Sequence, residues 1–132
     1  MKYCIKNTEN NLGFSRPEFK QITSSELDLL VDADEVYLGD ILWVDENILK
    51  LLASKVKPGT ILYVENIDIY EYIKGFWLDP NNINSFNKIF FNSGYTKVLD
   101  RAMIQKLIVD NGFNILFEVL DAGRVLITFK KN

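Results

Sequence analysis

The chain has 132 residues, 48% of them hydrophobic, and a formal net charge of -3, which is typical of one soluble globular domain with a real core. The acidic balance and the lack of a long basic run argue against nucleic acid as a partner, and no apolar run approaches the ~18 residues of a membrane helix. With no histidine and one cysteine, the usual Ser-His-Asp and Cys-His catalysis, His- or thiolate-bound zinc and an internal disulfide are excluded.

The first third of the chain predicts two short strands separated by a short helix. Residues 2–6 are expected to form the first strand. Ser24 or Ser25 stands where it can cap a short helix over residues 26–31. The apolar residues in 34–39 are typical of a buried strand, so a layered fold is already indicated.

A helix and a second buried strand follow. Residues 46–56 predict an amphipathic helix because one apolar stripe recurs at helical spacing: Ile48, Leu51, Leu52 and Val56. Asp45 stands where an N-cap belongs, and Pro58 with Gly59 ends the helix. Residues 61–64 lack polar alternation, which is typical of a parallel strand covered on both faces. The order predicts a parallel strand–helix–strand crossover.

The last third predicts a helix and a hairpin. Residues 67–74 are expected to form a short helix. Asp100 can cap a longer one, whose apolar stripe is Met103, Ile104, Leu107 and Ile108. Gly112 stands where a left-handed C-terminal glycine belongs. Residues 114–120 and 125–129 read as two strands, and the short turn between them predicts an antiparallel pair.

Several short motifs resemble those of class I S-adenosylmethionine-dependent methyltransferases. Lys57-Pro58-Gly59 before the strand at 61–64 resembles the family's "LKPGG" turn into its fifth strand. Asn111-Gly112-Phe113 resembles the recurrent "aGF" before the sixth strand, and residues 40–43 take the place of the segment after the fourth. The likeness covers about residues 34–130 and is nearest to small predicted methyltransferases associated with surface-sugar synthesis.

This resemblance implies an α/β fold: a truncated Rossmann-like methyltransferase sheet, mostly parallel, with a C-terminal antiparallel hairpin. We expect a single methyltransferase-like domain over 1–132, with a divergent N-terminal segment at 1–33 and the family-like part at 34–130. Family members bind the cofactor with a glycine-rich loop after the first strand, but here Gly13 stands alone and no G-x-G occurs. The cofactor half is therefore expected to be lost or supplied by a partner chain.

The implied strand order creates a problem at one edge of the sheet. In the family the fourth strand lies beside the first, so the strand at 34–39 would here be a bare edge with unpaired backbone groups. Residues 2–6 can pair there and give a compact five-stranded sheet. Otherwise a second chain must cover the edge, which predicts a homo-oligomer or a partner chain bound through 34–39.

Candidate cofactor and catalytic residues follow the strand at 34–39, because open α/β sheets bind ligands at the carboxyl ends of their strands. Asp40 can orient a substrate hydroxyl or act as a base, and its alternative role is that of a solvated loop acid or cap. Gly39 and Trp43 are the candidate cofactor-binding residues. The Trp43 ring can stack on adenine or a sugar, or pack in the core.

Candidate substrate-binding residues follow the next strand. Glu65, Asn66 and Asp68 end it at the same sheet edge and can form a small polar cluster with Asp40, although nothing in their spacing demands a metal, and none is expected. Between residues 70 and 95 eight aromatic side chains alternate with asparagines, and Trp77 is assigned to the substrate from this group. The same segment can instead be a lid or an oligomer interface.

Two functions from different classes follow. The first is a degenerate methyltransferase-like protein that binds S-adenosylmethionine or a related nucleotide or sugar ligand; any activity would be that of a transferase using this cofactor. The second is a non-catalytic binding or accessory subunit acting through protein–protein contacts. The lone Cys4 and an N-terminus without the apolar core of a signal peptide predict a cytoplasmic protein.

Overall fold

The computed structural model describes residues 1–5, 18–76, 84, 87, 90, 95–121 and 123–132. They form a six-stranded sheet of order β2-β1-β3-β4-β6-β5. The strands are β1 (Lys2–Ile5), β2 (Lys20–Ile22), β3 (Glu35–Gly39), β4 (Ile61–Ile67), β5 (Phe113–Asp121) and β6 (Arg124–Lys131). β1 to β4 pair in parallel, and β6 runs antiparallel to both β4 and β5. The α/β class and the C-terminal antiparallel hairpin are confirmed.

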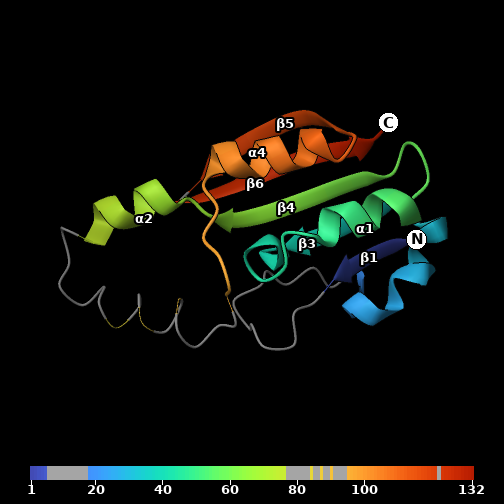
Figure 1. Cartoon of the computed structure of the whole chain (residues 1–132), viewed down its shortest axis with the longest axis horizontal. Helices are drawn as coiled ribbons and strands as arrows, with labels where there is room; N and C mark the ends of the chain where they lie inside the picture. Colours follow the sequence, from blue (N-terminus) through green and yellow to red (C-terminus); the bar gives the residue numbers. More distant parts are fainter. Residues whose placement is uncertain (6–17, 77–83, 85–86, 88–89, 91–94, 122) are drawn as a thin grey trace.

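The described helices lie between the strands in sequence. They are η1 (Ser24–Asp32), η2 (Ile41–Trp43), α1 (Ile48–Lys55), α2 (Ile69–Phe76) and α4 (Arg101–Asp110). α1 and α4 lie over the same face of the sheet, whereas α2 extends beyond the end of β4 (Figure 1). None of the helices in the described part of the chain is long and apolar enough to cross a membrane.

The ends of α4 follow the predicted capping pattern. The Asp100 side chain accepts a hydrogen bond from the backbone N–H of Met103 at 2.8 Å, which satisfies one of the free amides at the start of the helix. After the helix, Gly112 has a φ of +87°, a backbone conformation that a β-carbon disfavours. Local sequence signals therefore set both limits of this helix.

The burial pattern of α1 differs from the predicted stripe. The helix begins at Ile48 rather than at residue 46, because the Asp45 carboxylate accepts from the Asn47 amide at 3.0 Å and closes a turn before the helix. Leu49 is buried in place of Leu51, which is 47% exposed. Leucine stands at both positions, so only the orientation in which α1 packs on the sheet decides which of the two is buried.

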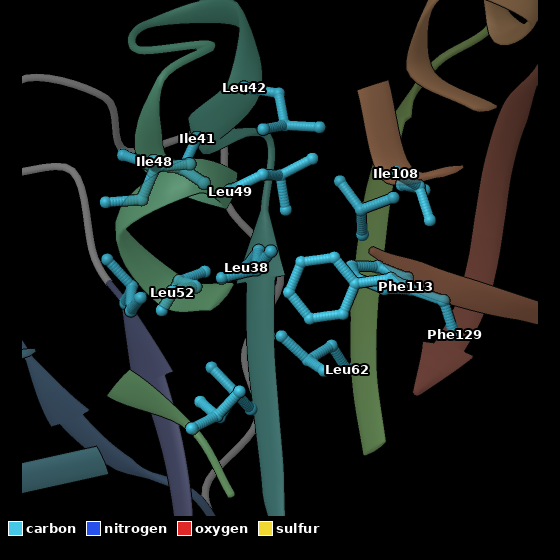
Figure 2. Packing of buried hydrophobic residues seen from close by; sticks show 14 of the residues in the cluster. Leu38, Ile41, Leu42, Ile48, Leu49, Leu52, Leu62, Ile108, Phe113 and Phe129 are labelled. Atoms are coloured by element: carbon cyan, nitrogen blue, oxygen red, sulfur yellow. The ribbon is translucent and has the colours of Figure 1, made fainter. Parts of the chain in front are cut away.

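β4 was predicted to be covered on both faces, and the two faces differ among the described residues. Its burial alternates along the whole strand, with Leu62, Val64 and Asn66 buried and the residues between them partly buried. One face of the sheet holds the main core, to which η1, η2, α1 and α4 all contribute. In Figure 2, Leu49 of α1 lies close to Leu38 of β3. Among the described residues, the helices thus cover one side of the sheet.

The opposite face of the sheet, here called the second face, carries a small cluster of its own. It contains Cys4, Phe19 and Tyr37, with Tyr63 packed against it. Phe19 meets both tyrosine rings edge-on, with ring centroids 6.3 and 6.4 Å apart. No described helix contributes to this cluster.

The strand expected to be a bare edge is not one. β1 pairs along one side of β3 and β4 along the other, so the first alternative, pairing by the N-terminal residues, is the one observed. β2 then adds a sixth strand beyond β1. The idea that a partner chain covers an open edge at 34–39 was wrong, because that edge is already hydrogen-bonded. Oligomerisation itself stays a prediction and needs another surface.

Candidate functional site

The carboxyl ends of the parallel strands meet at one edge of the sheet, which is where ligands bind in open α/β sheets. β3 ends there at Gly39, whose φ of +56° would strain any residue with a β-carbon. The chain can therefore turn sharply into η2. Asp40 follows as the first residue of that turn and is half-buried.

A distant segment closes over this turn. The Tyr95 hydroxyl donates a hydrogen bond to Oδ2 of Asp40. The backbone amides of Thr96 and Lys97 donate to the carbonyl oxygen of Trp43 at 2.9 and 3.1 Å. These bonds join residues more than fifty positions apart in the sequence and hold the 95–97 segment against η2.

Trp43 lies in the core and not on an open surface. It is 1% exposed, and its ring stacks on Phe90 at 5.9 Å and meets Tyr95 edge-on at 5.1 Å. Core packing was one of the two roles weighed for this residue, and its burial favours that role. Stacking of Trp43 on a cofactor stays a prediction, and it would require the ring to be uncovered.

Asn66 ties Trp43 to the ends of β3 and β4. Only one orientation of its buried amide satisfies all its neighbours. In that orientation its nitrogen donates to the carbonyl oxygens of Gly39 at 3.2 Å and Glu65 at 3.0 Å, and its oxygen accepts from Nε1 of Trp43 at 2.8 Å. A buried amide that uses both ends in this way holds the sheet edge in place.

A shallow apolar hollow of about 350 Å³ lies next to this edge. Its described lining comprises Ile69, Ile73, Phe90, Tyr95, Thr96, Lys97 and Val98. Tyr72 of α2 meets Phe90 edge-on at 5.8 Å. The Tyr72 hydroxyl is buried without a hydrogen-bond partner among the described residues, and burial raises its pKa. Tyr95 lines the hollow and its hydroxyl also donates to Asp40, so this one side chain links the carboxylate to the hollow.

The polar cluster predicted at the end of β4 does not form as a unit. Glu65 and Asn66 are neighbours in a strand, so they point to opposite faces of the sheet. Asp68 accepts from the backbone N–H of Tyr70 at 3.2 Å at the start of α2. Trp77 lies outside the described residues. Of the predicted site residues, Gly39, Asp40, Trp43 and Asn66 are brought together.

Glu65 belongs to a pair of cross-strand hydrogen bonds on the second face. The Tyr37 hydroxyl of β3 donates to Oε2 of Glu65 at 2.6 Å, and the Tyr63 hydroxyl of β4 donates to Oε1 of Glu35. Tyr37 and Tyr63 are direct neighbours across the two strands, so each reaches diagonally to the other strand's glutamate. Glu65 thus lies on the opposite face of the sheet from Asn66. The substrate-binding role of Glu65 stays a prediction.

The Glu35 contact makes stability depend on pH. The hydrogen bond from Tyr63 and then the one from Lys2 hold the pKa of Glu35 below its ordinary value of 4.5. A carboxylate with a lowered folded-state pKa stabilises the fold above its ordinary value, and this contribution is lost as the pH falls through the lowered pKa. We expect Tyr63→Phe to flatten the fall in melting temperature below about pH 4.5, measured by circular dichroism. An unchanged acid slope would contradict this.

Sequence reasoning missed the described lining of the hollow. Its signal was partial: the aromatic segment at 70–95 includes Phe90 and Tyr95. No local pattern links Tyr95 to Asp40, because the two are 55 positions apart. Ile69, Ile73 and Val98 are ordinary apolar residues whose placement depends on how α2 and the 95–98 segment approach each other.

No protein-family profile matches the sequence, and no curated protein matches it. In structure, the chain is similar to human N-acetylserotonin methyltransferase in complex with S-adenosylmethionine, with a TM-score of 0.58 and 20% identity over 92% of this chain and 36% of that one. It is also similar to an O-methyltransferase family 2 protein from Planctomyces limnophilus in complex with apigenin, with a TM-score of 0.58 and 14% identity over 89% of this chain and 36% of that one.

An O-methyltransferase family protein from Burkholderia thailandensis matches with a TM-score of 0.54 and 16% identity, over 87% of this chain and 36% of that one. At such identities the likeness shows the fold alone. The described sheet and helices are therefore a partial methyltransferase-like fold, and the chain spans about a third of the length of these proteins. That result agrees with the resemblance drawn from the Lys-Pro-Gly and Asn-Gly-Phe motifs.

Proposed function

We propose that the hollow beside Asp40 binds the adenosyl part of S-adenosylmethionine or of its demethylated product, and that the chain is a degenerate methyltransferase-like protein. One observation carries this: Tyr95 lines an apolar, partly aromatic hollow and donates a hydrogen bond to the Asp40 carboxylate at the carboxyl edge of a methyltransferase-like sheet. The human neighbour was solved with S-adenosylmethionine, which supports this choice of ligand.

The chemistry of the hollow suits a nucleoside. Its volume of about 350 Å³ lies at the lower end of the range for small-molecule sites. Phe90 and Tyr95 offer ring surfaces to a planar base, and Ile69 and Ile73 add aliphatic contacts. A carboxylate accepts several hydrogen bonds at once, so Asp40 can bind ribose hydroxyls while it accepts from Tyr95.

The described residues fit the methionine part of the cofactor less well. A carboxylate ligand needs backbone amides or a cation, and the sequence has no glycine-rich loop to present amides. The cation in the described lining is Lys97, whose ammonium lies 2.9 Å from Oε1 of Glu46. We therefore assign recognition to the adenosyl part, and no step of methyl transfer to the described residues.

The test is calorimetric titration with S-adenosylmethionine, its demethylated product and adenosine. All three should bind with dissociation constants within about tenfold of one another, because they share the recognised part. Asp40→Asn should weaken binding about tenfold or more, since a hydrogen bond to a charged group contributes about 1.5–3 kcal/mol. Asp32→Asn, at an exposed aspartate at the end of η1, is the matched control and should leave binding unchanged.

Two outcomes would contradict the proposal. One is the absence of a binding signal up to millimolar ligand with any of the three compounds. The other is saturable binding that Asp40→Asn leaves unaltered, which would place the ligand elsewhere. A monosaccharide or a non-adenine nucleotide that binds better than adenosine would redirect the ligand class while keeping the site.

A non-catalytic accessory subunit is the second candidate. The missing G-x-G motif favours it, as do the large apolar side chains that β5 exposes. Such a subunit would act through protein–protein contacts and would need no cofactor. A failed titration combined with a measured self- or partner-association would favour this candidate over the first.

A further inference from the structure

β5 is an outer strand of the sheet with an unusually apolar surface. It pairs with β6 on one side and has no strand partner on the other among the described residues. Figure 1 shows it along the outer margin of the sheet, with α4 over it. Four large apolar side chains of this nine-residue strand are 43–57% exposed: Leu116, Phe117, Val119 and Leu120.

These side chains lie on both faces of the strand. Phe117 and Val119 pair with Thr128 and Leu126, so they belong to the second face of the sheet. Leu120 pairs with the buried Val125 and therefore lies on the side of the main core. The strand thus exposes apolar surface above and below an edge whose backbone groups are unpaired within the described chain.

The usual protections of an edge strand are weak here. Natural edges carry lysine, proline or inward-pointing charges that discourage pairing, and Phe113–Asp121 contains no lysine or proline. Glu118 is the charged residue in its middle. Its Oε2 accepts from Nε2 of Gln105 at 2.7 Å and its Oε1 lies 3.4 Å from Nε of Arg101, so α4 holds the charge away from the edge. The remaining feature that can discourage edge pairing is the shift in the β5–β6 register between Ile115 and Phe117.

We propose that a second copy of this chain pairs with this edge, β5 against β5 and antiparallel, with a two-fold axis at Glu118. In an antiparallel pair, two residues that stand directly opposite each other lie on the same face of the sheet. In a symmetric dimer of this kind the two-fold axis is normal to the sheet, so one residue at the axis stands opposite the same residue of the second copy. With Glu118 at the axis, Phe117 faces Val119 of the second copy, and Leu116 faces Leu120. Aromatic–β-branched and apolar pairs of this kind stabilise sheets.

The neighbouring register fits less well. An axis at Phe117 would set the apolar Leu116 opposite the charged Glu118. With the axis at Glu118, the two Glu118 residues face each other, but Gln105 and Arg101 of the same chain hold each carboxylate toward α4 and away from the edge. The sequence of β5 is therefore self-complementary in one register, which favours a second copy over an unrelated chain.

α4 extends the proposed contact. Arg101, Gln105 and Val109 are spaced by four, so they lie along the flank of the helix that reaches β5, and Val109 is 57% exposed. The contact surface formed by the edge of β5 and the flank of α4 is about 30 Å long, the length of the strand. It is about 20 Å deep, measured from the second face of the sheet to the outer side of α4. This gives on the order of 1,200 Å² in total for two copies, the lower end for a specific interface.

Sedimentation equilibrium of the purified protein tests the proposal. We expect a dimer of twice 15.3 kDa, dissociating on dilution. Val119→Lys should raise the dissociation constant about 100-fold or more, because it places an ammonium at the paired edge. Leu51→Lys is the matched control: Leu51 of α1 is 47% exposed against 46% for Val119, and this variant should remain dimeric.

A cross-linking experiment tests the register. In a Cys4→Ser background, Phe117→Cys with Val119→Cys should give a covalent dimer on mild oxidation, because these positions face each other across the axis. Leu120→Cys with Val119→Cys, which lie on opposite faces, should not. A monomer at all concentrations would overturn the second copy as the occupant and leave the edge to a different chain. A dimer unaffected by Val119→Lys would place the interface elsewhere.

Discussion

Trp43→Ala is expected to lower the free energy of unfolding by about 3–5 kcal/mol, the usual cost of removing a large aromatic side chain from a core. Trp43 is 1% exposed, and its ring packs against Phe90 and Tyr95, so it fills the space beside η2. Alanine would leave a cavity there and an Asn66 amide without its donor. Urea unfolding followed by circular dichroism measures the loss.

Two further variants separate the causes of this effect. Trp43→Phe keeps a ring but removes the indole N–H, so it should cost about 1–3 kcal/mol, the penalty for one unpaired buried polar group and some lost volume. Met103→Ala removes a large apolar side chain that is 45% exposed and should cost less than about 1 kcal/mol. If Trp43→Ala were as mild as Met103→Ala, Trp43 would not be a core residue.

Asn66→Leu is expected to lower the free energy of unfolding by about 2–4 kcal/mol, although leucine has the same number of side-chain heavy atoms and the same branching as asparagine. The substitution leaves the Trp43 N–H and the Gly39 carbonyl oxygen buried without their partner, and each such group costs about 1–3 kcal/mol. Because these groups hold the turn that leads to Asp40, ligand affinity at the hollow should fall as well.

The matched control for Asn66→Leu is Asn114→Leu, since Asn114 is exposed on β5. That variant should change the free energy of unfolding by less than about 0.5 kcal/mol. Tryptophan fluorescence in a Trp77→Phe background reports Trp43 alone, because the chain has two tryptophans. A native emission spectrum unaltered by Asn66→Leu would contradict the hydrogen bond between the two residues.

Local signals in the sequence were enough to predict most of the elements. The helix stop at Pro58-Gly59, the Asp100 cap and the left-handed Gly112 act on their own neighbours, and each lies where the pattern placed it. The hairpin and the parallel crossover follow from alternation and chain order, and both are confirmed. The methyltransferase resemblance also rested on such short motifs, and the structural neighbours agree with it at the level of fold.

Patterns along the chain were less informative about faces and partners. In α1, leucines stand at both 49 and 51; the predicted stripe included Leu51, and packing against the sheet buried Leu49 in its place. In β4, the apolar run predicted coverage on both faces, but the described helices gather on one. The sequence left open whether residues 2–6 or a second chain would cover the edge of β3, and the structure places β1 there.

The sequence by itself determined the kind and order of the elements, because capping, turns and periodicity act over a few residues. Only the tertiary structure decided that Tyr95 reaches Asp40 across 55 positions, and that Asn66 bonds to Trp43 while Glu65 turns to the opposite face. Such contacts depend on how distant segments meet in space, where burial favours a hydrogen-bond partner for most polar groups. Local periodicity in the sequence cannot predict contacts between such distant residues, so the candidate site could be described only from the tertiary structure.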